Sequence, residues 1–203
     1  MRIILATNNK GKVAQIMPIF AGSGIELVTQ REAGIEGEAV EDGGTLEANS
    51  YKKAHYAWNC QYGRSVVSED TGLFIDALGG KPGVDTAYWA GTGKTDEEVI
   101  AFALDALRGV QDEKRTAVFR TVATFIGPHG QLEQFEGRLS GSLLTEPKGV
   151  HTPKLPFSSL FVPNGMYKTL AQMPLEQENL ISHRGLAFAK VRHYLLTGKR
   201  PSA

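Results

Sequence analysis

Cysteine is nearly absent from this chain of 203 residues, in which Cys60 is the single one. One cysteine cannot form a disulfide within the chain, so a disulfide framework of the kind that staples small secreted domains is excluded. The scarcity of cysteine fits a reducing compartment, and we expect a cytoplasmic protein. No second cysteine accompanies Cys60, so a packing role is favoured over that of a nucleophile.

The chain also lacks an excess of charge and any long hydrophobic run. Lys plus Arg and Asp plus Glu both number 22, which gives a formal net charge of zero. Without a general electrostatic attraction, we expect neither nucleic acid nor an anionic membrane as a partner. No apolar run approaches the roughly 18 residues of a membrane-spanning helix, and the N-terminal run is too short for a signal peptide. Any anion must therefore be bound by a local cluster of donors.

The remaining composition is that of an ordinary globular protein, with 41% hydrophobic and 22% charged residues. No internal repeat, low-complexity tract or cluster of Cys and His at metal-ligand spacing interrupts it. We expect residues 1–203 to form a single domain, large enough for two small lobes that share a core.

The central stretch, residues 68–91, joins an apolar strand signal to two adjacent acids, Glu69 and Asp70. Thr71 and Gly72 then predict a turn. Successive side chains of a strand point to opposite faces, so Glu69 and Asp70 should have different roles unless the strand twists. Buried acids need a cation or hydrogen-bond donors, whereas a solvated strand end needs neither. The residues alone leave both interpretations open.

The N-terminal segment predicts a buried strand at residues 2–6, a polar loop, and a helix at 12–20. A loop that leads into a helix presents free backbone N–H groups, which can bind an anion. Thr7 and Asn9 can add side-chain donors, and Lys12 a positive charge for phosphate. The alternative is a plain connection with a solvated lysine.

Further elements follow from periodicity and capping signals. We expect a strand at 25–28, a helix at 96–107, and a hairpin with strands at 115–126 and 131–141. Thr45 predicts the N-cap of a helix that ends near Asn59, on which Asn49 and Lys53 share a face.

Ser182 predicts the N-cap of a last helix, at 183–196. His183 and Arg184 then occupy its first turn, where the helix dipole disfavours cations. A bound anion or polar ligand nearby would explain both residues. A tertiary salt bridge is the alternative for Arg184, because arginine pairs readily with carboxylates.

Four segments, taken together and in order, resemble the inosine triphosphate pyrophosphatase family. They are ATNNKGKV at 6–13, Glu41 through Lys53, SEDTGLFIDALGGKPGV at 68–84, and ISHRG at 181–185. Each is weak alone, but the set is specific and spans nearly the whole chain. Members of the family cleave unusual purine nucleoside triphosphates to a monophosphate and pyrophosphate.

The resemblance implies a fold, a cofactor and roles for particular residues. The fold would be α/β, an elongated mixed β-sheet flanked by helices, in two lobes with a central cleft, and the protein would be a homodimer. Asp70 would activate water, and Mg²⁺ would be held by Glu41 and Asp70, with Glu69 assisting. The substrate-binding residues would be Thr7, Asn9, Lys12, Lys53, Thr71, Phe157, Ser158, Glu178, His183 and Arg184.

The chain departs from the family where the base is recognised. Ser158 and Ser159 replace an aspartate and a proline, Glu178 replaces a lysine, and Tyr88 replaces an arginine usual in bacterial members. The phosphate-binding motifs are intact while the base-reading segment is altered, and the resemblance gives inosine and xanthosine triphosphates, the usual substrates of the family, as the default substrates. One alternative is a pyrophosphatase for a nucleotide that presents an amino group to Glu178, although a Glu178–Arg184 salt bridge would give this residue a structural role.

A second alternative is a nucleotide-binding regulator without turnover. The presence of Asp70, Glu41 and Lys53 argues against it, since a pure binder does not need a general base.

Overall fold

The computed structural model describes residues 1–201; residues 202 and 203, which the predicted domain includes, lie outside the described part. Its strands are β1 (Arg2–Leu5), β2 (Glu26–Thr29), β3 (Ser65–Ile75), β4 (Pro82–Gly83), β5 (Thr116–Ile126), β6 (Leu132–Leu143) and β7 (Phe161–Pro163). Its α-helices are α1 (Lys10–Ile16), α2 (Leu46–Cys60), α3 (Asp96–Ala106), α4 (Leu175–Ile181) and α5 (His183–Thr197). Short 3-10 turns, among them η1 (Met17–Phe20) and η5 (Pro156–Ser159), join several of them.

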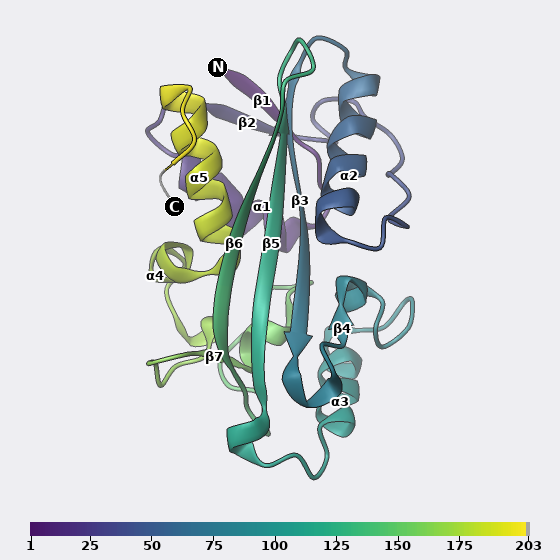
Figure 1. Ribbon diagram of the computed structural model, residues 1–203, viewed down its shortest axis with the longest axis vertical. Helices are drawn as coiled ribbons and strands as arrows, with labels where there is room; N and C mark the ends of the chain where they lie inside the picture. The colour runs from purple at the N-terminus through teal and green to yellow at the C-terminus, as the bar shows by residue number, and fades with distance from the viewer. Residues whose placement is uncertain (202–203) are drawn as a thin grey trace.

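All the strands belong to one mixed sheet with the order β2-β1-β3-β5-β6-β7, and β4 pairs with β3. β1 is parallel to β2 and β3, while the other pairs are antiparallel. The long strands β3, β5 and β6 run along most of the molecule (Figure 1). The predicted elongated mixed sheet and the predicted hairpin, β5 with β6, are confirmed.

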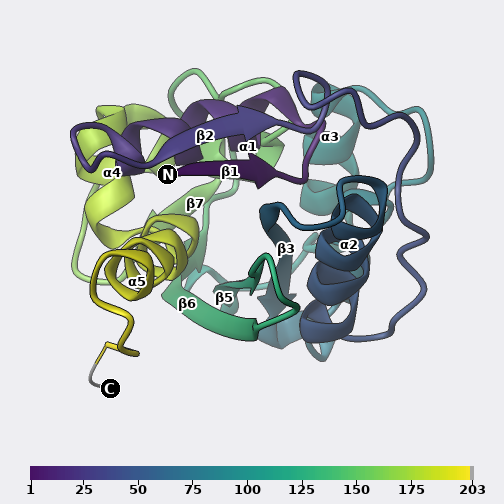
Figure 2. The same ribbon diagram turned by 90° about the horizontal axis from the view of Figure 1, so that it is seen from above.

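Helices flank this sheet on both sides, with α5 and α2 on opposite sides of the long strands, and the sheet curls when seen from above (Figure 2). Both predicted caps are confirmed: Thr45 Oγ1 accepts a hydrogen bond from Ala48 N at 3.1 Å, and Ser182 Oγ accepts one from Gly185 N at 3.0 Å. Helix α4 was not predicted. No helix within residues 1–201 has both the length and the apolar character needed to cross a bilayer.

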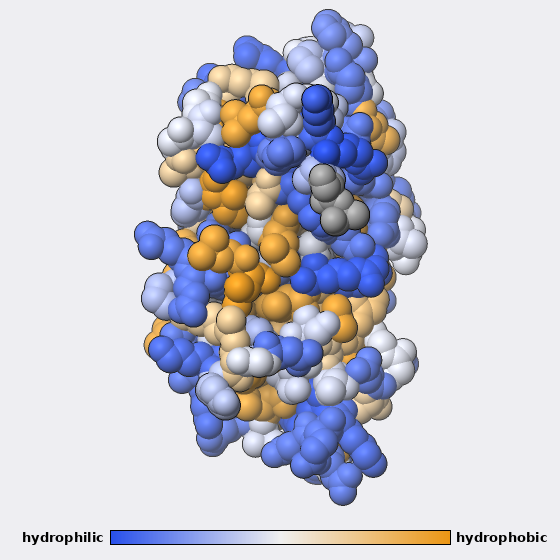
Figure 3. Space-filling model, turned by 60° about the vertical axis from the view of Figure 1, so that its left-hand side comes forward, coloured by the Kyte–Doolittle hydropathy of each residue, from blue (hydrophilic) through white to orange (hydrophobic). Residues whose placement is uncertain are grey.

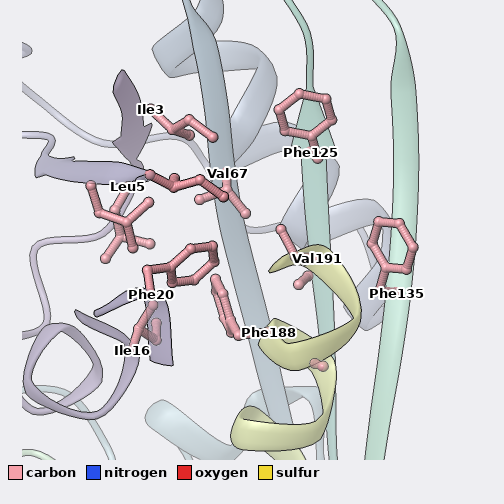
Figure 4. Close-up of a cluster of buried hydrophobic side chains, with 13 residues drawn as sticks. Ile3, Leu5, Ile16, Phe20, Val67, Phe125, Phe135, Phe188 and Val191 are labelled. Carbon is pink, nitrogen blue, oxygen red and sulfur yellow. The ribbon is translucent and has the colours of Figure 1, made fainter. Parts of the chain in front are cut away.

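The apolar core is divided between the two ends of the molecule. At one end, Ile3, Leu5 and Val67 of the sheet pack against Phe188 and Val191 of α5 (Figure 4). At the other end, a separate cluster joins the far halves of β3 and β5 to α3 and η5. A third cluster lies between α2 and the sheet. The first and third clusters both include residues of β1 and β2, whereas the second lies at the other end of β3, and these two ends correspond to the two predicted lobes.

Strand β3 links the lobes, and its polar residues 68–71 lie between two apolar stretches. Val67 belongs to one core and Leu73 to the other. On one edge, β1 pairs with residues 65–67 and β4 with residues 73 and 74, so the registers leave residues 68–72 without a strand partner there. Side chains at this gap in the edge can face a ligand.

The predicted turn at Thr71 and Gly72 is wrong, because β3 continues through both residues to Ile75. Pairing with β5 holds the strand straight, and Gly72 lies opposite Arg120. The glycine serves a close approach instead: a Cβ on Gly72 would lie 2.6 Å from the carbonyl oxygen of Gly83. A packing requirement was therefore mistaken for a turn signal.

Candidate active site

Glu69 and Asp70 are both buried near the middle of β3, and each has its own set of partners. Glu69 contacts Lys12 of α1 and Arg184 of α5, whereas Asp70 contacts Lys53 of α2. This separation follows from the alternation of side chains along a strand, as predicted. The two acids therefore hold two different groups of cations at one place on the strand.

Glu69 is ion-paired with two cations, although its Oε1 makes no hydrogen bond among the described residues. Its Oε1 lies 2.7 Å from Lys12 Nζ and 3.7 Å from Arg184 Nε, and its Oε2 accepts a hydrogen bond from Thr71 Oγ1 at 2.6 Å. Burial alone would raise the pKa of Glu69, but Lys12, Arg184 and Lys53 hold it far below its ordinary value. Glu69 is therefore a permanent anion that fixes two cations and a hydroxyl group.

Asp70 has a free oxygen. Its Oδ1 accepts a hydrogen bond from Lys53 Nζ at 2.7 Å, while its buried Oδ2 has no hydrogen-bond partner among the described residues. Burial raises the pKa of Asp70 above its ordinary value despite the attraction of Lys53. An acid with an open oxygen and a raised pKa is suited to accept a proton near neutral pH.

Lys53 also binds Glu41, whose Oε2 lies 3.0 Å from Lys53 Nζ. The ammonium group of Lys53 therefore joins Asp70 to Glu41. A small cavity of about 50 Å³ beside them is lined by Ala6, Gln30, Glu38, Ala39, Glu41, Lys53 and Tyr56. Within residues 1–201, no three acids, histidines or cysteines are already gathered as a metal site. The free oxygen of Asp70 and the nearby Glu41 fit a Mg²⁺ ion that takes its remaining ligands from substrate phosphates and water.

The loop before α1 makes its own internal bonds. Asn9 caps the helix by accepting a hydrogen bond from Lys12 N at 3.1 Å, and Thr7 Oγ1 accepts one from Asn9 N at 3.2 Å. These bonds fix the loop that brings Lys12 to Glu69. Contacts of Thr7 and Asn9 with a substrate stay predictions.

His183 and Arg184 lie in the first turn of α5, as predicted, and both are buried. The ring of His183 stacks on Phe119, with the centroids 4.4 Å apart. Burial lowers the pKa of His183 well below its ordinary value, so the ring is neutral at pH 7. Its Nδ1 has no partner among the described residues, which leaves a polar atom available to a ligand.

The glycine of the ISHRG motif has a packing explanation. A Cβ on Gly185 would lie 1.9 Å from the carbonyl oxygen of Asn179, so only glycine allows α4 and α5 to meet at this corner. The corner presents Glu178, His183 and Arg184 on neighbouring elements.

Glu178 has a partner that the sequence analysis did not foresee. The carboxylate accepts a hydrogen bond from Gln15 Nε2 at 2.6 Å, and the other end of the Gln15 amide accepts one from Arg184. The expected alternative, a direct Glu178–Arg184 salt bridge, is replaced by this relay. Gln15 lies three residues after Lys12, on the same face of α1, and that spacing was the available signal.

Phe157 and Ser158 lie in η5 and are both buried. Phe157 is part of the second core, near Trp89, and Ser158 Oγ donates a hydrogen bond to the carbonyl oxygen of Leu155 at 2.8 Å. Among the described residues, no hydrogen bond joins either residue to the acids of β3. Their role toward a nucleobase stays a prediction.

The fold and the site together define a class: an α/β protein with buried acids and cations at the junction of two lobes, an arrangement suited to binding phosphate groups. Comparison with known proteins then gives the family. Residues 3–194 match the model of the Ham1 family, and the chain belongs to that family.

Relatives and solved structures agree with this assignment. The dITP/XTP pyrophosphatase of Caldanaerobacter subterraneus subsp. tengcongensis is 40% identical over 97% of this chain and 96% of its own length. That of Geobacter sulfurreducens is 38% identical over 96% of both. The structure of the Staphylococcus aureus Ham1 protein superposes with a TM-score of 0.83 at 30% identity, covering 98% of this chain and 100% of the other.

Proposed function

We propose that this chain hydrolyses purine nucleoside triphosphates to the nucleoside monophosphate and pyrophosphate, with inosine, deoxyinosine and xanthosine triphosphates as default substrates. The observation that carries the proposal is the pair of neighbouring acids on β3, of which one is neutralised by two cations and the other keeps a free oxygen. The names of the relatives support the same reaction.

In the proposed reaction, a water molecule attacks the α-phosphorus and Asp70 accepts one of its protons. The bond between that phosphorus and the oxygen that bridges to the β-phosphorus breaks, and pyrophosphate leaves with the electron pair. Asp70 is suited to this role because its Oδ2 is free and its pKa is raised. Lys12 and Lys53 would bind phosphate oxygens, each already placed by an acid of β3.

We propose Mg²⁺ as the cofactor, held by Glu41 and Asp70; Glu69 stays a predicted ligand. When bound, the ion supplies neutralisation of the charge on the phosphates. Glu69 already has two cationic partners, whereas Asp70 has one, so Asp70 is the stronger candidate of the two.

A homodimer in the cytoplasm completes the proposal. In Figure 3 the molecule is turned so that the left-hand side of Figure 1 comes forward, and apolar residues are gathered on this face. Leu180 of α4 and Leu196 of α5 are exposed apolar side chains. A second copy would bury such a surface. Light scattering on the wild type and on Leu180→Glu tests this assembly: a monomeric wild type contradicts it, and a dimer that survives the substitution moves the interface elsewhere.

The activity is tested by measuring pyrophosphate release with Mg²⁺ over a panel of natural and modified nucleoside triphosphates. We expect release with the inosine and xanthosine nucleotides and little with the common ones. Tight binding of triphosphates without release would instead support the non-catalytic regulator, and a best substrate with an exocyclic amino group would support the role of Glu178 in reading the base.

A further inference from the structure

We infer that Gln15 is a positioning residue that orients Arg184 at the site through a buried hydrogen-bond relay ending at Glu178. The inference deepens the proposed function and rests on it for its kinetic test. Gln15, Glu178 and Arg184 are all buried, with 4%, 7% and 3% of their surface exposed. They come from α1, α4 and α5, respectively.

The chemistry of the two partners fixes the orientation of the Gln15 amide. A guanidinium group can only donate hydrogen bonds, so the amide oxygen must face Arg184. The amide NH₂ group is then directed at Glu178, whose carboxylate accepts its hydrogen bond at 2.6 Å. No flipped arrangement satisfies both partners, because the NH₂ group would then meet the N–H groups of Arg184.

The relay determines where the guanidinium lies. Arg184 has three neighbours at the site: the Gln15 amide, Thr71 Oγ1 at 3.3 Å, and Glu69 Oε1 at 3.7 Å. Its Nε makes no hydrogen bond among the described residues, and its Nη1 donates to the Gln15 amide oxygen. The helix of Gln15 is also tied to α4 by a second bond, from Asn179 Nδ2 to the Gln15 carbonyl oxygen at 2.9 Å.

An amide between Glu178 and Arg184 has a different consequence from a direct salt bridge. A carboxylate in contact with the guanidinium would cancel its charge, whereas an amide orients the group and leaves that charge for an anionic substrate. Glu69 does not cancel it alone, because Lys12 shares the same carboxylate. Gln15 thus holds Arg184 in place while the site keeps its attraction for phosphate.

The test reverses the relay. In Gln15→Glu, two carboxylates face each other at hydrogen-bond distance, and the link to Glu178 is lost. In the double variant Gln15→Glu with Glu178→Gln, the new carboxylate accepts from Arg184 and from the new amide. The connections of the wild type then return, but a carboxylate now contacts the guanidinium directly. Gln177→Glu, on the exposed face of α4, is the matched control for the added charge.

Two measurements are made on each variant: kcat and KM for inosine triphosphate, and the Kd of its non-hydrolysable α,β-methylene analogue. We expect Gln15→Glu to lower kcat/KM and weaken analogue binding by about tenfold or more, as for loss of one buried polar contact. The double variant should recover the melting temperature of the wild type but not its affinity for the analogue, because a carboxylate now cancels the charge of Arg184. The control Gln177→Glu should match the wild type in both measurements. Thermal melting shows whether each variant is folded.

A folded Gln15→Leu variant with wild-type kcat/KM and Kd overturns the positioning role of Gln15. A double variant that binds the analogue as tightly as the wild type overturns the charge-sparing role of the Gln15 amide. Should the wild type bind the analogue but release no pyrophosphate, the proposed function fails, and the analogue Kd values alone decide on Gln15. Should the wild type not bind the analogue, both proposals are overturned.

Discussion

The two faces of β3 at Glu69 and Asp70 make an instructive comparison. The two residues are adjacent in sequence, carry the same functional group and are both buried. On one face, Glu69 meets Lys12, Arg184 and a hydroxyl group, and its pKa falls far below the ordinary value. On the other face, Asp70 meets one lysine that it shares with Glu41, and its pKa rises. Burial raises the pKa of both acids, and the cations around Glu69 outweigh that effect whereas those around Asp70 do not, so one serves as a fixed anion and the other is suited to act as a base.

The largest expected effect is on turnover at Asp70. Asp70→Asn should lower the rate by about 10²- to 10⁴-fold, because the amide cannot take a proton from water. The fold should remain, since Lys53 keeps Glu41 as a partner. Pyrophosphate release and thermal melting check this, with Asp105→Asn on the exposed side of α3 as control. A folded variant that keeps more than half of the wild-type rate removes Asp70 from the mechanism.

The next effect is on stability at Glu69. Glu69→Gln leaves Lys12 and Arg184 without their shared anion, and breaking a buried ion pair costs about 3–5 kcal/mol of unfolding free energy. Urea unfolding measures the loss, and Glu176→Gln on the surface of α4 is the control. If Glu69→Gln loses no more unfolding free energy than Asp70→Asn does, the proposed difference between the two acids is contradicted.

The stability contribution of Glu69 also depends on pH, with a definite sign. Its pKa in the folded protein is below the ordinary value of 4.5, so folding favours the ionised form. The contribution is fully present above the unfolded pKa and is lost as the pH falls toward the folded pKa. Urea unfolding from pH 7 to pH 3 should therefore show the gap between wild type and Glu69→Gln narrowing below about pH 5. A gap that widens on acidification contradicts this sign.

A smaller effect is expected at the two lysines. Lys12→Ala and Lys53→Ala should each weaken triphosphate binding by about 1.5–3 kcal/mol, the contribution of a charge-assisted hydrogen bond, and leave nucleoside binding nearly unchanged. Calorimetric titration with a non-hydrolysable triphosphate and with the nucleoside makes the comparison. Lys52→Ala is a close control, because Lys52 is the neighbour of Lys53 on α2 but pairs with Asp42 outside the site. Equal losses for both ligands would indicate damage to the fold.

The smallest effect concerns specificity at Glu178. A carboxylate only accepts hydrogen bonds and a lysine only donates them, so Glu178→Lys should shift preference from adenosine toward inosine triphosphate by about ten- to two-hundred-fold if Glu178 touches the base. The ratio of kcat/KM values for the two nucleotides measures it. An unchanged ratio in a folded, active variant would show that Glu178 does not contact the base and serves only as the partner of Gln15.

The comparison also separates what could be predicted from what could not. Alternation along a strand predicted different roles for Glu69 and Asp70, and capping chemistry predicted the starts of α2 and α5. The turn at Thr71 and Gly72 was predicted wrongly, because the need for glycine there comes from Gly83, which approaches from another strand. Gln15 was missed because its two partners lie more than 160 residues away.

The sequence by itself determined most of the local elements and, through its four motifs, the family, because helix periodicity, caps and strand alternation depend only on neighbours along the chain. Helix α4 and the continuation of β3 through Gly72 are the exceptions. The tertiary structure alone decided which cation meets which acid. Lys12, Lys53 and Arg184 come from three helices, and packing of those helices on a curled sheet gives Glu69 two cations and leaves Asp70 an open oxygen. Such long-range distances set the pKa values of the two acids, and spacing along the chain does not contain them.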